Sequence, residues 1–191
     1  NRFRSRSGEP LNILEEPDHL VVAASEREVI PYHEGIYTIY AQARSVVESW
    51  YLQIKVDGLE YVSSAQAVLS GMVGSNLIAT NTRMTEPEAA IWFNLQKSDD
   101  KGVPVICTVF DTFGRIDRST NNLEVTFNIQ TTDGKTVVRT FDISGLFETE
   151  NAIRHHWLLL DETIKIDPPQ TGGGFDPKVD DWDEEHHDVI I

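Results

Sequence analysis

Apolar and polar residues alternate along much of the chain with a period of two. The clearest run covers residues 50–57, WYLQIKVD, in which Trp50, Leu52, Ile54 and Val56 are apolar and the intervening positions are mostly polar. Successive side chains of a β-strand point to opposite faces, so this pattern predicts a strand with one buried face.

The same alternation predicts a β-hairpin in the second half of the chain. Leu123 to Gln130 alternate apolar and polar residues, as do Val137 to Ile143, and Thr132-Asp133-Gly134-Lys135 lies between them. Asp-Gly is a strong signal for the tight turn of a hairpin, because its glycine accepts a positive φ.

Further short runs complete an all-β fold. Strands are expected at residues 19–24, 36–43, 60–69, 88–95, 103–110 and 155–166, a helical turn or bulge within 41–47 and 64–69, and a short helix at 147–153. Short strands that alternate on one face are typical of antiparallel sheets and not of parallel α/β sheets. We therefore expect an antiparallel β-sandwich of about seven to eight strands with a transthyretin-like or Ig-like Greek key.

Composition divides the chain into three parts. Residues 1–17 carry Arg2, Arg4 and Arg6 with Gly8 and Pro10, and we expect a solvated arm or interdomain linker there. Residues 18–168 form the expected β-sandwich domain, and residues 169–191 form a tail. No stretch approaches the roughly 20 apolar residues of a membrane span, and no signal peptide is present at the start of this sequence.

The tail combines a hinge with a dense acidic cluster. Gly172, Gly173 and Gly174 precede a segment with seven acidic residues and one lysine, which carries −6 of the formal net charge of −15. Such runs resist collapse and stay solvated. Apolar side chains within it could nevertheless dock, either on the chain's own sheet or on a partner strand: Phe175, Val179, Trp182, Val189 and Ile191.

Residues that could carry chemistry do not form a recognisable site. The single Cys107 lies in an apolar run, and the pairs His155-His156 and His186-His187 would point to opposite faces of a strand. The acidic tail lacks a calcium-loop pattern. We expect no catalytic, cofactor-binding or metal-binding residues and no cofactor, and a net charge of −15 with a pI near 4.7 argues against nucleic acid.

Several segments resemble a known family. Residues 59–72, LEYVSSAQAVLSGM, the later Thr112-Phe113-Gly114, the hairpin of residues 123–141 and the closing pattern GGGFDPxVDDW are similar to the second domain of Bacteroidales minor fimbrial subunits, the FimB/Mfa-type anchor lipoproteins and their relatives. The resemblance covers roughly residues 28–191.

The resemblance implies a non-enzymatic outer-membrane lipoprotein at the cell surface, built from transthyretin-like sandwiches. It also implies an anchor or accessory subunit of a type V pilus, with other fimbrial subunits as partners through β-strand complementation. This sequence departs from the family pattern because it has no lipobox cysteine and little of a first sandwich, so the membrane would be reached only through a lipid anchor on a longer parent.

One alternative stays open. A surface glycan-binding lipoprotein module could also be an acidic β-sandwich, and it would expose aromatic side chains flanked by polar groups. The burial of Trp50, Trp92 and Trp157 would separate the two hypotheses.

Overall fold

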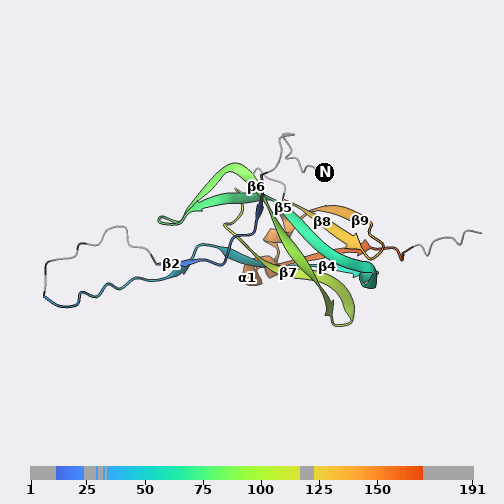
Figure 1. Ribbon diagram of the computed structural model, residues 1–191, viewed down its shortest axis with the longest axis horizontal. Helices are drawn as coiled ribbons and strands as arrows, with labels where there is room; N and C mark the ends of the chain where they lie inside the picture. The colour runs from blue at the N-terminus through green and yellow to red at the C-terminus, as the bar shows by residue number, and fades with distance from the viewer. Residues whose placement is uncertain (1–11, 24–28, 30–31, 33, 117–122, 170–191) are drawn as a thin grey trace, which may run out of the picture.

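The chain forms a curled sheet (Figure 1). An apolar core lies on one face of this sheet. The computed structural model describes residues 12–23, 29, 32, 34–116 and 123–169. The strands are β1 (Asn12–Glu15), β2 (Val21–Val22), β3 (Arg44–Ser45), β4 (Glu48–Asp57), β5 (Val62–Leu77), β6 (Thr82–Asp100), β7 (Val103–Thr112), β8 (Glu124–Thr131), β9 (Thr136–Asp142) and β10 (Trp157–Lys165). Three short helices are η1 (Leu59–Tyr61), η2 (Ser144–Glu148) and α1 (Glu150–His155).

Eight strands belong to one hydrogen-bonded sheet, in the order β10-β4-β7-β6-β5-β8-β9, with β1 attached to β6. The strands β5, β6 and β7 follow one another antiparallel, and β4 lies beside β7, which is a Greek-key arrangement. The strands β2 and β3 form a separate two-stranded ladder.

The protein is mostly β, but the expectation of a purely antiparallel sandwich is wrong. β10 runs parallel to β4, and β1 runs parallel to β6, so the sheet is mixed. The single sheet curls into a half-barrel instead of dividing clearly into two facing sheets. Side-chain alternation gives which face of a strand is buried and carries no information on strand direction, which explains the error.

The core consists of the inward residues of both halves of the curled sheet. On β4 the exposed fractions of Trp50, Leu52, Ile54 and Val56 are 5%, 1%, 0% and 1%, and the β8 residue Phe127 is fully buried in the same cluster. Each large apolar side chain that is removed from water contributes roughly 1.5–3 kcal/mol to stability.

The predicted hairpin is confirmed as β8 and β9. Its turn contains Gly134 at φ +82°, and the Asp133 carboxylate accepts hydrogen bonds from Thr131 and pairs with Lys135 Nζ at 2.7 Å. These contacts, the Lys135 side chain first, lower the pKa of Asp133 to about 2. The strand predicted at 50–57 and the one at 103–110 are also confirmed, as β4 and β7.

Other boundaries differ from the prediction. Residues 36–43 alternate apolar residues but form no strand, and Ile36 and Tyr40 are 94% and 93% exposed. Of residues 19–24 only Val21 and Val22 are a described strand, and residues 64–69 are regular strand without a helical turn. β5 and β6 extend well beyond the predicted runs. The short helix predicted at 147–153 appears as α1, where the Thr149 hydroxyl accepts a hydrogen bond from Ala152 N and caps its first turn.

Candidate functional site

The β6–β7 hairpin opens part of the way along its length. The two strands pair from Asp100↔Val103 to Gln96↔Cys107, and beyond that point β6 pairs with β5 while β7 pairs with β4. Three residues further along each strand, the rings of Phe93 and Phe110 stack with their centroids 4.3 Å apart and their planes 4° from parallel. Aromatic side chains thus occupy the position where backbone pairing ends, and one edge of β6 is left free.

β1 occupies that free edge. Asn12 to Glu15 pair in parallel with Ala89 to Trp92 of β6. Leu14 is half-buried and lies beside Gly74 of β5, because a Cβ built on Gly74 would be 3.7 Å from Leu14 Cδ1, an ordinary contact distance. Within the described part of the chain, the rest of this β6 edge, from Thr82 to Glu88, pairs with no second strand.

Polar contacts fix the chain just after β1. The Asp111 backbone N–H on β7 donates to Glu16 Oε2 at 3.1 Å, while the Asp111 carboxylate accepts from Ser49 Oγ and lies 3.2 Å from His19 Nδ1. Burial raises the pKa of Glu16 above its usual value, and the charges of Asp111 and Glu15 add to this effect, while the Asp111 N–H opposes it. Keeping the Glu16 carboxylate ionised beside β7 therefore has a free-energy cost at neutral pH, and partial burial of the carboxylate is its largest cause.

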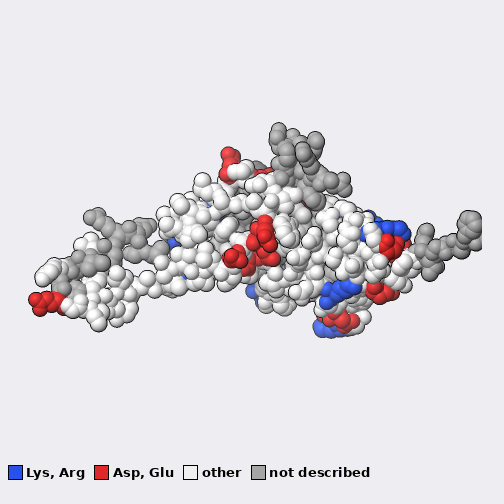
Figure 2. All heavy atoms as spheres, viewed as in Figure 1, with Lys and Arg blue, Asp and Glu red and all other residues white. Residues whose placement is uncertain are grey.

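Acidic side chains gather around this contact. A depression of about 590 Å³ is lined by Glu15, Glu16, Pro17, Asp18, His19 and Asp111. Figure 2 shows Asp and Glu side chains clustered near the middle of the face that it draws. No group of three or more His, Cys, Asp or Glu side chains among the described residues is arranged to hold a metal ion.

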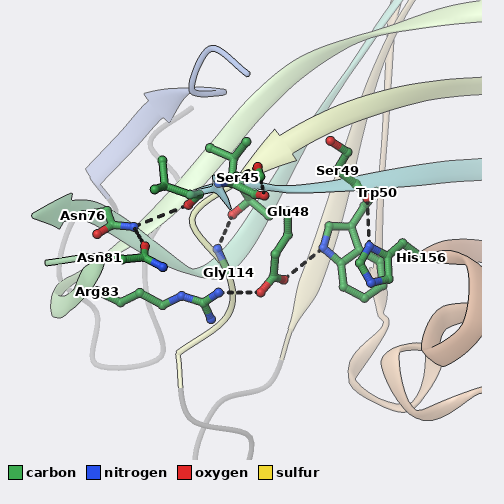
Figure 3. Close-up of polar contacts among 12 residues, drawn as sticks. Ser45, Glu48, Ser49, Trp50, Asn76, Asn81, Arg83, Gly114 and His156 are labelled. Carbon is green, nitrogen blue, oxygen red and sulfur yellow. Dashed lines mark hydrogen bonds and ion pairs between the residues drawn. The ribbon is translucent and has the colours of Figure 1, made fainter. Parts of the chain in front are cut away.

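A second polar cluster lies at the start of β4 (Figure 3). Glu48 pairs with Arg83 Nη2 at 2.6 Å and accepts from Trp50 Nε1 at 3.3 Å. The Trp50 and His156 rings stack at 4.5 Å. A Cβ on Gly114 would lie 2.5 Å from Arg83 Nη1, so glycine allows this close approach. The Glu48–Arg83 ion pair joins β4 to β6, and the Trp50–His156 stack joins β4 to the residue before β10, so these two contacts hold together elements that are distant in sequence.

The arginines of this cluster border a pocket of about 520 Å³. Arg115 lies 4.4 Å from the centroid of the Phe147 ring and 3.5 Å from the Glu148 carboxylate. Because Arg83 and Arg115 each pair with a glutamate, the pocket shows no uncompensated positive charge for an anionic ligand.

The three tryptophans differ in burial. Trp50 is 5% exposed and packs in the core, Trp92 is half-buried, and Trp157 is 44% exposed on β10. Burial of all three tryptophans would have argued against a glycan-binding surface. Because Trp157 is exposed, that argument does not apply.

The site residues predicted in the tail cannot be placed. Gly172 to Gly174 and the apolar residues Phe175, Val179, Trp182, Val189 and Ile191 all lie outside the described residues. Sequence reasoning missed β1, because Asn12 to Glu15 are too few to show a period and fall in the segment expected to be an arm. The only sequence signal is the pair Ile13-Leu14 beside an otherwise polar stretch.

Comparison with known proteins identifies the fold. No protein-family model and no curated protein matches the sequence. A crystal structure of a candidate adhesin from Bacteroides ovatus ATCC 8483 matches with a TM-score of 0.60 at 19% identity, over 83% of this chain and 61% of the adhesin chain. The chain thus spans about three fifths of that protein's length, and at this identity the match shows a shared fold.

Proposed function

We propose that this chain is part of a non-enzymatic cell-surface adhesion protein, an anchor or accessory subunit of a type V fimbria that acts through β-strand complementation. The observation that carries the proposal is the edge of β6 beyond the point where β6 and β7 separate, at which the four described residues of β1 pair. The shared fold with a candidate Bacteroides adhesin supports the surface location and the adhesion class. A lipid anchor on the longer parent would attach it to the outer membrane.

The contacts of β1 suit a strand that another segment can replace. Among its described residues β1 contributes one half-buried apolar side chain, Leu14, and the contact that follows it through Glu16 is weakened by the partial burial of the Glu16 carboxylate. An incoming strand could pair with Ala89 to Trp92 and continue towards Thr82, with Pro87 donating no backbone hydrogen bond to it. Each added backbone hydrogen bond and each apolar side chain over Gly74 would favour the longer strand.

The other sheet edges suit this role less well. On β10 the pairing with β4 is interrupted between Leu160 and Thr163, where the exposed Asp161 and Glu162 lie. A bulge with charged side chains protects a strand edge from further pairing. β9 carries exposed Arg139 and Thr140 on a short edge.

The partner of the β6 edge would be an extended segment of another fimbrial subunit. We also keep the tail as a candidate strand, with Gly172 to Gly174 as its hinge and Phe175, Val179, Trp182, Val189 and Ile191 as its apolar contacts. Neither nucleic acid nor a cofactor has a role in this proposal.

A capture experiment tests the proposal. The tagged full chain, its Leu14→Asp variant and a form ending at Gly172 are each incubated with the fimbrial subunits of the same cells. Leu14→Asp weakens the packing of β1 and does not alter β6, so this variant should capture several-fold more fimbrial subunit than wild type. The matched surface variant Val138→Asp on β9 should capture as much as wild type. Equal capture by wild type and Leu14→Asp would contradict an acceptor site at β6, and loss on truncation would assign a role to the tail.

A further inference from the structure

Three outward-facing side chains form a row across the outer face of the sheet. Trp157 of β10 is the register partner of Tyr51 on β4, and Tyr51 is the register partner of Val109 on β7. Trp157 is 44% exposed and Val109 64% exposed, while Tyr51 is half-buried. Leu158 and Leu160 of β10 point into the core, so the alternation of the strand places Trp157 and Leu159 outward.

The orientation of the Trp157 indole is fixed by its neighbours. The Tyr51 ring meets it edge-on at 6.3 Å, with 66° between the planes, and the His155 ring lies 4.8 Å away on a tilt of 34°. An aromatic side chain that is supported on two sides loses little conformational entropy when a ligand packs on it.

A chain of hydrogen bonds runs beside this row. The Tyr51 hydroxyl donates to Gln53 Oε1 at 2.6 Å, and Gln53 Nε2 donates to Asp100 Oδ2 at 3.2 Å. Burial, followed by a hydrogen bond with Cys107, raises the pKa of Tyr51 to about 12, so its hydroxyl remains protonated across the physiological range. Asp100 and Lys101, at the tip of the β6–β7 hairpin, are both exposed.

These groups enclose a depression of about 560 Å³ that is lined by Tyr51, Gln53, Asp100, Lys101, Val109, Trp157 and Leu159. This volume falls within the range of small-ligand sites, which combine an apolar and aromatic lining with a few placed polar groups. One exposed indole is a small contact surface beside the roughly 800 Å² per partner that a stable protein interface buries.

We propose that this depression binds a neutral sugar unit of a glycan, with the pyranose ring packed on Trp157 and its hydroxyl groups bonded to Asp100, Lys101 and Gln53. A pyranose presents an apolar C–H face together with a rim of hydroxyl groups that both donate and accept hydrogen bonds. The depression presents an aromatic surface at Trp157 for the C–H face, and polar groups at Asp100, Lys101 and Gln53 for the hydroxyl groups. One carboxylate and one ammonium group balance in charge there, and the chain as a whole is strongly acidic, which disfavours anionic sugars.

The site lies on the outer face of β4, β7 and β10, away from the β1 contact with β6, so it does not depend on strand complementation. The protein could therefore bind a glycan and assemble with other subunits at the same time.

Binding to a printed array of neutral and acidic oligosaccharides tests this proposal, followed by calorimetric titration with the neutral oligosaccharide that gives the strongest signal. The wild-type chain should bind neutral glycans. Trp157→Ala should weaken binding by about tenfold or more, Asp100→Asn should weaken it less, and Val138→Ala on β9 should leave it unchanged. Circular dichroism of each variant confirms that the fold is retained.

Three results would overturn the proposal. The first is an array on which no neutral glycan binds. The second is binding confined to acidic glycans, and the third is neutral-glycan binding that survives Trp157→Ala. If Trp157→Ala instead reduces the capture of fimbrial subunits while no glycan binds, this face contacts protein and the proposal fails, whatever the outcome at β6.

Discussion

Phe93 of β6 and Phe110 of β7 stack face to face where the two strands of their hairpin separate. If β6 and β7 continued to pair in the same register beyond Gln96↔Cys107, Phe93 would lie opposite Phe110. Both rings are 1% exposed, so the stack fills the start of the opening with apolar surface while the backbone edge of β6 passes to β1. The acceptor edge that we propose therefore depends on a packed core and not on a loop.

This ring pair should be energetically coupled. Phe93→Ala and Phe110→Ala should each lower the free energy of unfolding by about 3–5 kcal/mol, because each leaves a cavity in the core. The loss in free energy of unfolding of the double variant should be smaller than the sum of the two single losses by about 0.5–1.5 kcal/mol. Each single variant loses the stacking interaction, but the double variant loses it only once. Urea unfolding of the four proteins measures this difference, and strict additivity would show that the rings do not interact.

The attachment of β1 should depend on pH through Glu16. Its raised pKa means that the folded state keeps the proton to a higher pH than the unfolded chain does. The stability that protonated Glu16 contributes is fully present at pH values below the pKa of Glu16 in the unfolded chain. It is lost as the pH rises through the pKa of Glu16 in the folded protein. Glu16→Gln keeps an oxygen acceptor for the Asp111 N–H and removes the charge, so it should stabilise the protein at pH 7 by up to about 1 kcal/mol, since the site is largely solvent-screened.

Thermal unfolding between pH 4 and 7 measures the Glu16 effect as the difference between Glu16→Gln and wild type at each pH. The difference should grow with pH, and the exposed control Glu162→Gln on β10 should show no such growth. A difference that does not change with pH would contradict the role assigned to the Asp111 contact.

The β8–β9 turn should titrate in the opposite direction. Asp133 has a pKa lowered to about 2, with the Lys135 side chain as the largest cause. Stability from this contact is present above the unfolded pKa, near 3.9, and is lost as the pH falls through 2. NMR titration of the Asp133 carboxyl should give a midpoint near 2 in wild type and a midpoint closer to its usual value in Lys135→Ala. An unchanged midpoint would show that Lys135 is not the main cause.

Two glycines with the same backbone conformation should respond differently to alanine. Gly58 and Gly134 have φ values of +83° and +82°, but an added Cβ would lie 2.2 Å from the Ile166 carbonyl oxygen at Gly58 and would meet nothing within 4 Å at Gly134. Gly134→Ala should cost only the left-handed strain, about 1–2 kcal/mol. Gly58→Ala should cost clearly more in the same urea unfolding assay. Equal costs would mean that the turn between β4 and η1 moves freely away from Ile166.

Local patterns predicted the parts of this fold that depend on local chemistry. The run from Trp50 to Val56 shows which residues are buried, and Asp133-Gly134 specifies the hairpin turn without reference to the rest of the chain. The same rule failed at residues 36–43, where Tyr37, Ile39 and Ala41 fall on one face of the expected strand but the chain forms no strand. Alternation alone is therefore not sufficient for a strand, because it does not supply the partner strand.

The candidate sites depend on relations that the sequence does not display. The pairing of β1 with β6 joins residues more than 70 positions apart in parallel, and nothing in Asn12 to Glu15 specifies that partner. Trp50 and Trp157 both lie in strand-like runs, yet Trp50 faces the core and Trp157 faces the outer surface. The register of β10 on β4 decides the face on which Trp157 lies, and the sequence does not display that register.

The most direct test of the proposed function fixes β1 in place reversibly. Ile13 and Ala90 are register partners on β1 and β6, and a Cα separation typical of paired strands suits a disulfide. The full chain carrying Ile13→Cys, Ala90→Cys and Cys107→Ser is used for fimbrial-subunit capture before and after reduction. A control joins Thr126→Cys and Thr140→Cys across β8 and β9, where the two hydroxyl oxygens lie 2.9 Å apart. The account predicts that the oxidised Ile13–Ala90 form captures no subunit, that reduction restores capture, and that the control captures in both states; undiminished capture by the oxidised form would contradict strand exchange at β6.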